Sequence, residues 1–219
     1  SVQLDLRSNN VLRDVNAWYH IVFKVDTTQA TEANRAKIYL NGEEVSYAIS
    51  TRPSQNTDLL FNVAETILIN RYDNSTPRPC VMSHFHFTDG YAYDASAFGS
   101  TDATTGEWKI NTNPSVNYGT NGFFILKDGN SVTDQSGNSN NWTVGGGTLT
   151  KTEDNPSNVF ATLNPLYTFD ASLTYTKGNT VVADSGGADS WTTRYAISSL
   201  GMMSGKYYAE TKISNIGSN

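Results

Sequence analysis

Residues 16–45, NAWYHIVFKVDTTQATEANRAKIYLNGEEV, decide the fold. Apolar and aromatic side chains recur at every second position from residue 18 to 26 and again from 35 to 40, which is the period of half-buried β-strands. Asn41-Gly42 follows the second segment, and this pair readily adopts the positive φ angles of a two-residue hairpin turn. The stretch therefore predicts an antiparallel sheet whose buried face carries Tyr19, Ile21, Phe23, Val25, Ala36, Ile38 and Leu40.

The composition of the 219 residues also favours an all-β protein. Hydrophobic residues make up 37% and charged residues only 16%, and Asn, Thr, Ser and Gly fill much of the remainder. Such a mixture suits a β-sandwich with long polar loops better than a helical bundle, which needs more Ala, Leu, Glu and Lys. Aromatic residues, 11% of the chain, are spread over its whole length, so we expect a packed core rather than disorder.

Charge and cysteine content exclude several classes of function. The net charge is −6 and the basic residues are scattered, so no nucleic-acid partner is expected. No apolar run is long enough for membrane insertion, and SVQLDL at residues 1–6 is not a signal peptide. Because these residues already alternate, we interpret the chain as a fragment that lacks N-terminal strands or as a processed product. Cys80 is the single cysteine, so the fold must be held by its core and not by a disulfide.

Similar patterns predict the remaining elements. A short helical turn is expected at residues 94–99, with Asp94 as its N-cap, and another turn of helix fits the polar loop at residues 27–34. Further strands are expected at residues 1–11, 66–71, 81–88, 122–127, 172–176 and 204–213.

Several motifs give the chain a family resemblance. WYHIV, a loop and KIYLNG, then FTDG at residues 87–90 with DASAFG at 94–99, and DQSGNSNNW at 134–142 resemble laminin-G-like domains. These domains belong to the concanavalin-A-like lectin and glucanase superfamily, and the version here is similar to that in adhesin-like proteins of tailed bacteriophages. FATLNPL at residues 160–166 resembles the junction that ends this domain in the phage proteins. The resemblance implies a jelly-roll β-sandwich over residues 1–166.

The last part of the chain resembles a different β-sandwich. SGKYYAETKI at residues 204–213 is similar to the S-G-K-x-Y-x-E strand near the start of SPRY domains, although Ala209 stands where that family usually has Trp. The resemblance implies that residues 167–219 begin an SPRY-like domain that is truncated here. Two alternatives are that these strands complete the first sandwich or that they pair with another chain.

Two groups of residues are candidates for metal binding. His84 and His86 lie two apart on a predicted strand, so both imidazoles point to one face, where His20 or Asp89 would be a third ligand; the alternative is a plain polar outer face over Phe85 and Phe87. Asp26, Asp73, Asp89 and Asp134 begin loops, and the laminin-G resemblance implies one Ca²⁺ at a sandwich rim. The alternative is that these residues cap turns. The oxygen-rich loop with Asp134, Asn138 and Asn140 is the best calcium candidate.

Catalytic motifs are not found in the sequence. The glucanases of the superfamily use two glutamates placed alternately on one strand, whereas Glu43 and Glu44 are adjacent and face opposite sides. Cys80 has only Arg78 nearby to stabilise a thiolate, so an inert thiol is expected. We therefore predict that the chain is not an enzyme.

Exposed aromatic residues are the better functional candidates. Flat aromatic faces stack on sugar rings and dominate protein interfaces, although in a sandwich some of them instead line the second buried face. The predicted ligand-binding residues are Trp18, Tyr39, Tyr72, Tyr91, Tyr93 and Trp108.

These features lead to two functional hypotheses. The first is a non-enzymatic structural or adhesion protein on the extracellular surface of a tailed-phage virion: a tail fibre, a head fibre or a capsid decoration. It would bind host glycan or neighbouring virion proteins and form a homo-oligomer, such as a trimer. The alternative is a secreted bacterial or algal carbohydrate-binding or adhesion module with rim calcium.

Overall fold

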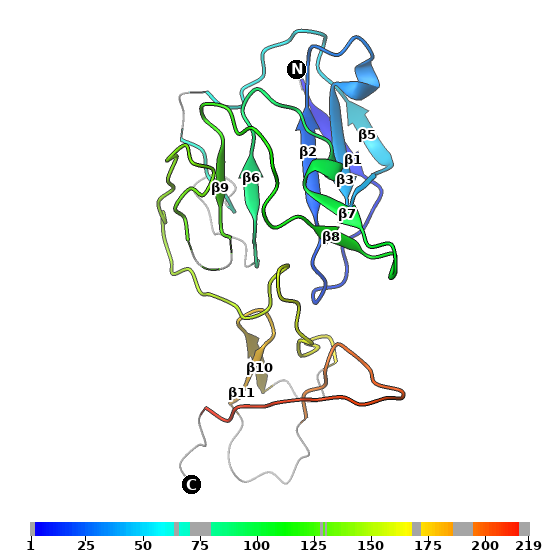
Figure 1. Ribbon diagram of the computed structural model, residues 1–219, viewed down its shortest axis with the longest axis vertical. Helices are drawn as coiled ribbons and strands as arrows, with labels where there is room; N and C mark the ends of the chain where they lie inside the picture. Colours follow the sequence, from blue (N-terminus) through cyan, green and yellow to red (C-terminus); the bar gives the residue numbers. More distant parts are fainter. Residues whose placement is uncertain are drawn as a thin grey trace. The chain divides into compact units, whose positions relative to one another are not determined.

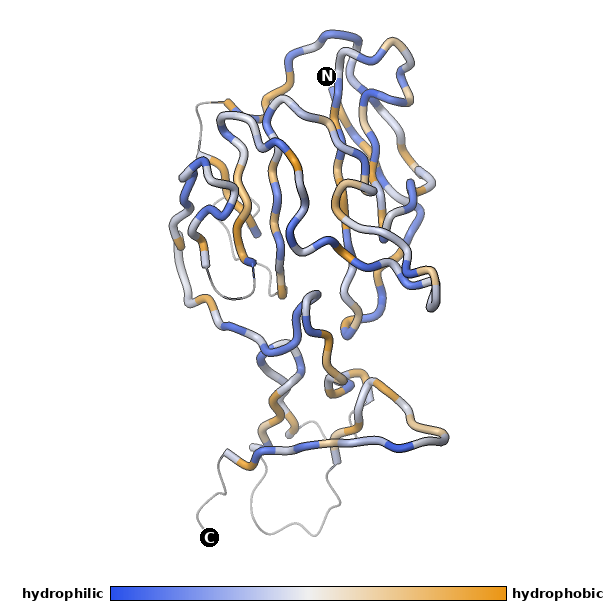
Figure 2. Tube along the Cα trace, in the orientation of Figure 1, coloured by the Kyte–Doolittle hydropathy of each residue, from blue (hydrophilic) through white to orange (hydrophobic). Residues whose placement is uncertain are grey.

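The computed structural model shows an almost all-β chain (Figure 1). It describes residues 3–63, 66–70, 80–127, 129, 131–167, 172–185 and 195–214. Within these ranges there are eleven strands and two short 3₁₀ helices, so the predicted all-β class is confirmed. No helix in the described residues is long and apolar enough to cross a membrane. Figure 2 shows hydrophobic residues both in strands such as β9 and in several of the connections.

The chain divides into two compact units. Unit 1 comprises Ser1–Lys151 with Asn155–Ser157, and unit 2 comprises Thr152–Asp154 with Asn158–Asn219. The domain junction predicted at residues 166 and 167 falls within unit 2.

The described residues of unit 1 form four small antiparallel sheets. β1 pairs with β5, β2 with β3 and β3 with β4, β6 with β9, and β7 with β8. The elements are β1 (Asp5–Ser8), β2 (Ile21–Val25), η1 (Glu32–Asn34), β3 (Ala36–Leu40), β4 (Glu43–Glu44), β5 (Tyr47–Thr51), β6 (Phe85–Phe87), η2 (Ala95–Ala97), β7 (Gly99–Thr101), β8 (Trp108–Ile110) and β9 (Phe123–Ile125).

The predicted central hairpin is present. β2 and β3 pair over their full length, from Ile21 opposite Leu40 to Val25 opposite Ala36. Asn41 and Gly42 have φ angles of 49° and 88°, as the predicted turn requires. The helical turns predicted in the loop at 27–34 and after Asp94 are the single 3₁₀ turns η1 and η2.

The burial expected for this hairpin is correct at one end only. Ala36 is fully buried, but Ile21 and Phe23 are 56% and 47% exposed, so the prediction that both are buried is wrong. Phe23 makes an edge-to-face contact with Phe61, whose ring is itself exposed. The alternation fixes the two faces of a strand, but which face is covered depends on the elements that pack on it.

The core of unit 1 is centred on β9. Phe123, Phe124 and Ile125 are all buried, and they pair with Phe87, His86 and Phe85 of β6. Phe85 and Phe87 stack on Phe123, while His86 stacks on Phe124 with ring centroids 4.0 Å apart. Both faces of this strand pair therefore carry packed side chains. The expected polar outer face at His86 is wrong, because Phe98, Tyr118 and Phe124 surround its ring.

Unit 2 is built on the antiparallel hairpin of β10 (Leu173–Thr176) and β11 (Val181–Asp184). A single bridge joins Leu163 and Ser198 beside it, and Thr162 is buried against Ser199. Two predicted strands are not formed: residues 66–70 have no strand, with residue 71 outside the described ranges, and residues 204–213 have none either.

The hairpin turn gives a direct test of this packing. A Cβ on Gly42 would overlap the Trp108 ring, and Gly42 also needs a positive φ. We expect Gly42→Ala to lower the free energy of unfolding by about 3 kcal/mol, since a left-handed non-glycine residue costs about 1–2 kcal/mol and an overpacked site a similar amount. Urea titration followed by tryptophan fluorescence measures the change.

The matched control is Gly90→Ala. Gly90 also has a positive φ, of 77°, but its Cβ would meet no atom within 4 Å. We expect Gly90→Ala to lower the free energy of unfolding by only about 1 kcal/mol, which is the cost of placing a non-glycine residue in the left-handed region. Equal losses in the two variants would contradict the packing of Trp108 on the turn.

Candidate functional site

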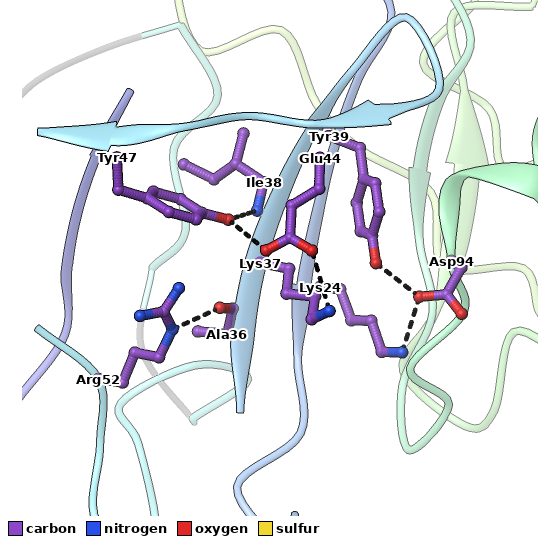
Figure 3. Close-up of polar contacts among 9 residues, drawn as sticks. All are labelled: Lys24, Ala36, Lys37, Ile38, Tyr39, Glu44, Tyr47, Arg52 and Asp94. Carbon is purple, nitrogen blue, oxygen red and sulfur yellow. Dashed lines mark hydrogen bonds and ion pairs between the residues drawn. The ribbon is translucent and has the colours of Figure 1, made fainter. Parts of the chain in front are cut away.

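One face of the β2–β3–β4 sheet carries two ion pairs (Figure 3). Lys24 and Lys37 lie directly opposite each other across β2 and β3, and only 18% and 21% of their side-chain surfaces are exposed. Opposed like charges destabilise a sheet, so each ammonium group needs a carboxylate. Asp94 lies 2.8 Å from the Lys24 Nζ, and Glu44 lies 2.9 Å from the Lys37 Nζ.

Two tyrosines complete these pairs. The Tyr39 hydroxyl donates to the same Asp94 oxygen that Lys24 contacts, at 2.8 Å. Burial and the neighbouring Asp94 carboxylate hold the pKa of Tyr39 well above its usual value, so the hydroxyl remains a neutral donor. The hydrogen bonds from Lys24 and Tyr39 lower the pKa of Asp94. Asp94 is therefore kept ionised, which suits a structural ion pair better than a general acid.

The second pair is anchored in the same way. The Tyr47 hydroxyl donates to Glu44 Oε1 at 3.3 Å and accepts the Ile38 amide hydrogen at 2.9 Å. The Arg52 guanidinium lies over the Tyr47 ring, 4.9 Å from its centroid, and Arg52 Nε donates to the Ala36 carbonyl. Figure 3 shows these side chains directed toward one another over the sheet. Tyr39, one of the predicted ligand-binding residues, is thus part of a packed polar cluster.

Tyr91 and Tyr93 form a second aromatic group in the loop after β6. Their rings are nearly parallel, at 14°, with centroids 5.9 Å apart. The Asn117 side chain donates to the Tyr91 hydroxyl at 2.8 Å, and the Asn117 backbone amide donates to the Tyr93 hydroxyl at 3.0 Å. Tyr91 is 44% exposed and Tyr93 is half-buried. One residue therefore fixes both rings while leaving Tyr91 open to solvent.

Trp108 has a structural position. Its Nε1–H donates to His20 Nδ1 at 3.0 Å, and its ring stacks on the His20 imidazole and covers Gly42 and Gly99. Burial lowers the pKa of His20, which keeps this nitrogen free to accept. Trp18 is half-buried just before β2, and Tyr72 lies outside the described residues. Of the predicted aromatic residues that the structure describes, Tyr91 alone is more than a third exposed.

The loop predicted to bind calcium is closed by its own hydrogen bonds. Asp134 is buried, and its two carboxylate oxygens accept from the backbone amides of Phe124, Ser136 and Asn140 and from the Ser136 hydroxyl, at 2.7–2.9 Å. The Asn138 and Asn140 side chains donate their amide hydrogens to carbonyl oxygens of residues 119, 120 and 122. The loop therefore clamps itself onto β9, and we propose no ion there.

The other metal candidates are likewise engaged in the protein. Burial and the nearby His84 lower the pKa of His86 to about 3, and its Nδ1 lies 2.8 Å from the Tyr118 hydroxyl. Asp26 caps the turn at Thr28, and Asp89 accepts from Asn62 and Asn121, while Asp73 lies outside the described residues. In the described part of the chain, no group of three His, Cys, Asp or Glu side chains is placed to hold a metal.

The environment of the single thiol, Cys80, disfavours its reactive form. Cys80 lies at the surface, and partial desolvation of its sulfur raises the pKa of the thiol. A raised pKa disfavours the thiolate, which is the reactive form.

Several residues of these clusters were not predicted. Lys24, Lys37 and Asp94 were not recognised as a set, although the hairpin register alone would have placed the two lysines opposite each other. The sequence did not indicate a role for Asn117, because its partners Tyr93 and Tyr91 lie 24 and 26 residues earlier in the chain.

Comparison of the chain with models of known protein families, with curated proteins and with solved structures found no match.

The hydrogen bonds accepted by Asp134 can be tested by replacing one of its carboxylate oxygens with an amide nitrogen. We expect Asp134→Asn to lower the free energy of unfolding by about 2–3 kcal/mol, since the amide nitrogen replaces an acceptor that buried N–H groups need. Burial raises the pKa of Asp134, but the hydrogen bonds from Phe124, Ser136 and Asn140 outweigh it, so the pKa lies below its usual value. The carboxylate therefore stabilises the fold above pH about 4, the unfolded value, and this contribution is lost as the pH falls through the lower, folded value.

Chemical denaturation of both proteins at several pH values measures this difference. The control is Asp58→Asn, because Asp58 is exposed. A difference between wild type and Asp134→Asn that grows on acidification would contradict the assignment.

Proposed function

We propose that the chain is a non-enzymatic surface protein of a tailed-phage virion that binds glycan through the Tyr91–Tyr93 pair. The location, whether tail fibre, head fibre or capsid decoration, rests on the motif resemblance. The binding surface rests on one observation: an exposed tyrosine ring that is held in place from its hydroxyl end.

The form of this group suits a sugar. A pyranose presents an apolar face of C–H groups that packs on a flat aromatic ring, and its hydroxyls need polar partners at the ring's edge. Tyr91 offers 44% of its surface, while Thr88, Asn117 and Asn121 provide polar groups around the same loops. The Tyr93 ring lies nearly parallel to the Tyr91 ring, with the centroids 5.9 Å apart, so the two rings form one offset pair.

A non-catalytic role is supported by how the carboxylates are used. Glycosidases place two carboxyl groups on either side of the scissile bond. Here Asp94 and Glu44 each hold a lysine, and Asp134 closes a loop. Glu43 and Glu44 lie at adjacent positions of β4, so their side chains leave the strand on opposite sides.

A single tyrosine pair would bind a glycan only weakly, so we propose that several copies of the chain act together. Several copies on one particle would raise the overall affinity by avidity without any new contact. A homo-oligomer fits this requirement, and neighbouring virion proteins would be the other partners.

A glycan array with the purified chain tests the binding role. We expect binding to a defined set of glycans, and we expect Tyr91→Ala to weaken it by about tenfold or more, since aromatic anchors dominate such contacts. Tyr91→Phe keeps the ring and should bind nearly as well. Phe61→Ala, which removes another exposed ring, should leave binding unchanged.

A second measurement tests the location. Mass spectrometry of purified virions should find this chain, and antibodies against it should label intact particles. Glycan binding without any virion association would instead favour the secreted carbohydrate-binding module. Equal binding by wild type and Tyr91→Ala would refute the assigned surface.

A further inference from the structure

Residues 204–213, SGKYYAETKI, begin with a bend at Ser204 and Gly205 and continue as a strand-like segment that has no strand partner among the described residues. The chain runs straight here (orange to red in Figure 1), and no backbone hydrogen bond joins it to another described segment. Its apolar side chains are open to solvent: Tyr207 is 59% exposed, Tyr208 85% and Ile213 75%. Extended chain with exposed apolar groups and unpaired amides is a template for pairing with another strand.

The side chains of this segment alternate as in a strand. The Tyr208 hydroxyl donates to Glu210 Oε2 at 2.9 Å, so these two side chains share one face. Lys206 and Lys212 fall on that face by the same period of two, and Tyr207, Ala209 and Ile213 fall on the other. One face is therefore charged with a central aromatic ring, and the other is mostly apolar, with Thr211 as its polar member.

The sequence around Tyr208 is complementary to itself when two copies run antiparallel. With Tyr208 opposite its own copy, Lys206 lies opposite Glu210 and Glu210 opposite Lys206. On the other face Tyr207 lies opposite Ala209 in both directions, a large residue against a small one. Opposite charges and aromatic pairs across strands both stabilise a sheet.

Other pairings of two copies fit less well. A parallel, in-register pair would place Lys206 on Lys206 and Glu210 on Glu210, which is repulsive. An antiparallel pair centred on Thr211 would match Glu210 with Lys212, but it leaves Lys206 and Tyr208 without these partners.

We propose that residues 204–213 are a dimerisation strand that pairs antiparallel with the same strand of a second copy, about a two-fold axis at Tyr208. The interface is isologous, since each copy contributes the same residues. The inference does not rest on the glycan role, because none of its residues belongs to the Tyr91–Tyr93 group.

Charge reversal tests the register. Sedimentation velocity of the full chain should show a monomer–dimer equilibrium. Lys206→Glu, or Glu210→Lys alone, places like charges opposite each other twice per dimer, and should raise the dimer Kd by about tenfold or more. The double variant Lys206→Glu/Glu210→Lys should restore the dimer.

Lys212→Glu is the matched control. It makes the same charge change on the same face, but in this register residue 212 lies opposite Ser204, so the dimer should persist. All these positions are exposed, and circular dichroism should show unchanged folding. A wild-type chain that stays monomeric, a double variant that stays as weak as the single ones, or an equal loss with Lys212→Glu would each overturn the proposal.

Cross-linking gives an independent measure. On a Cys80→Ser background, Tyr208→Cys should form a disulfide-linked dimer under mild oxidation, since directly opposed residues of antiparallel strands have Cα atoms about 4.5–5.5 Å apart. Ala209→Cys should not, because it faces Tyr207 of the other copy. A cross-link at residue 209 in preference to residue 208 would also overturn the register.

Discussion

Two lysines that face each other across β2 and β3 impose the constraint on which unit 1 depends. Their side chains are mostly covered and their like charges are opposed, so both need a carboxylate, and these come from β4 and from Asp94 before η2. Asp94 does not cap η2 with its side chain, because Lys24 and Tyr39 engage it instead. The chain that Asp94 begins continues through η2 and β7 to β8, where Trp108 returns to the hairpin turn. The ion pairs thus fasten the hairpin at its face, and the packing of Trp108 on Gly42 fastens it at its tip.

The sequence predicted the strands of this hairpin well and their environment poorly. Alternation and Asn41-Gly42 located β2, β3 and the turn, because these depend on local backbone preferences. Ile21 and Phe23 were expected inside, yet the lysine face is the one that is covered. Burial depends on the segments around Asp94 and Trp108, which arrive some seventy to eighty-eight residues later. No local pattern contains that information.

Polar side chains were located correctly, but the partners of their atoms could not be read from the sequence. The Asp134 loop was the best calcium candidate, with turn capping as the alternative, and in the structure Asn138 and Asn140 turn their amide hydrogens toward backbone carbonyls. An asparagine offers both a donor and an acceptor, and its neighbours in space decide which one is used. The same holds for His86, which the strand period placed on a polar face and which the aromatic rings of Phe98, Tyr118 and Phe124 enclose.

The two exposed aromatic features differ in what binding would cost them. Tyr91 is already held through its hydroxyl by Asn117 and paired with the Tyr93 ring, so little conformational entropy remains to be lost when a ligand packs on the ring. Residues 204–213 have no comparable support in the described chain, and ordering them must oppose part of the pairing energy. An isolated two-stranded ribbon is marginal in water. Pairing of this segment therefore depends on its complementary charges and rings, and it responds to single substitutions more sharply than the clamped surface of unit 1.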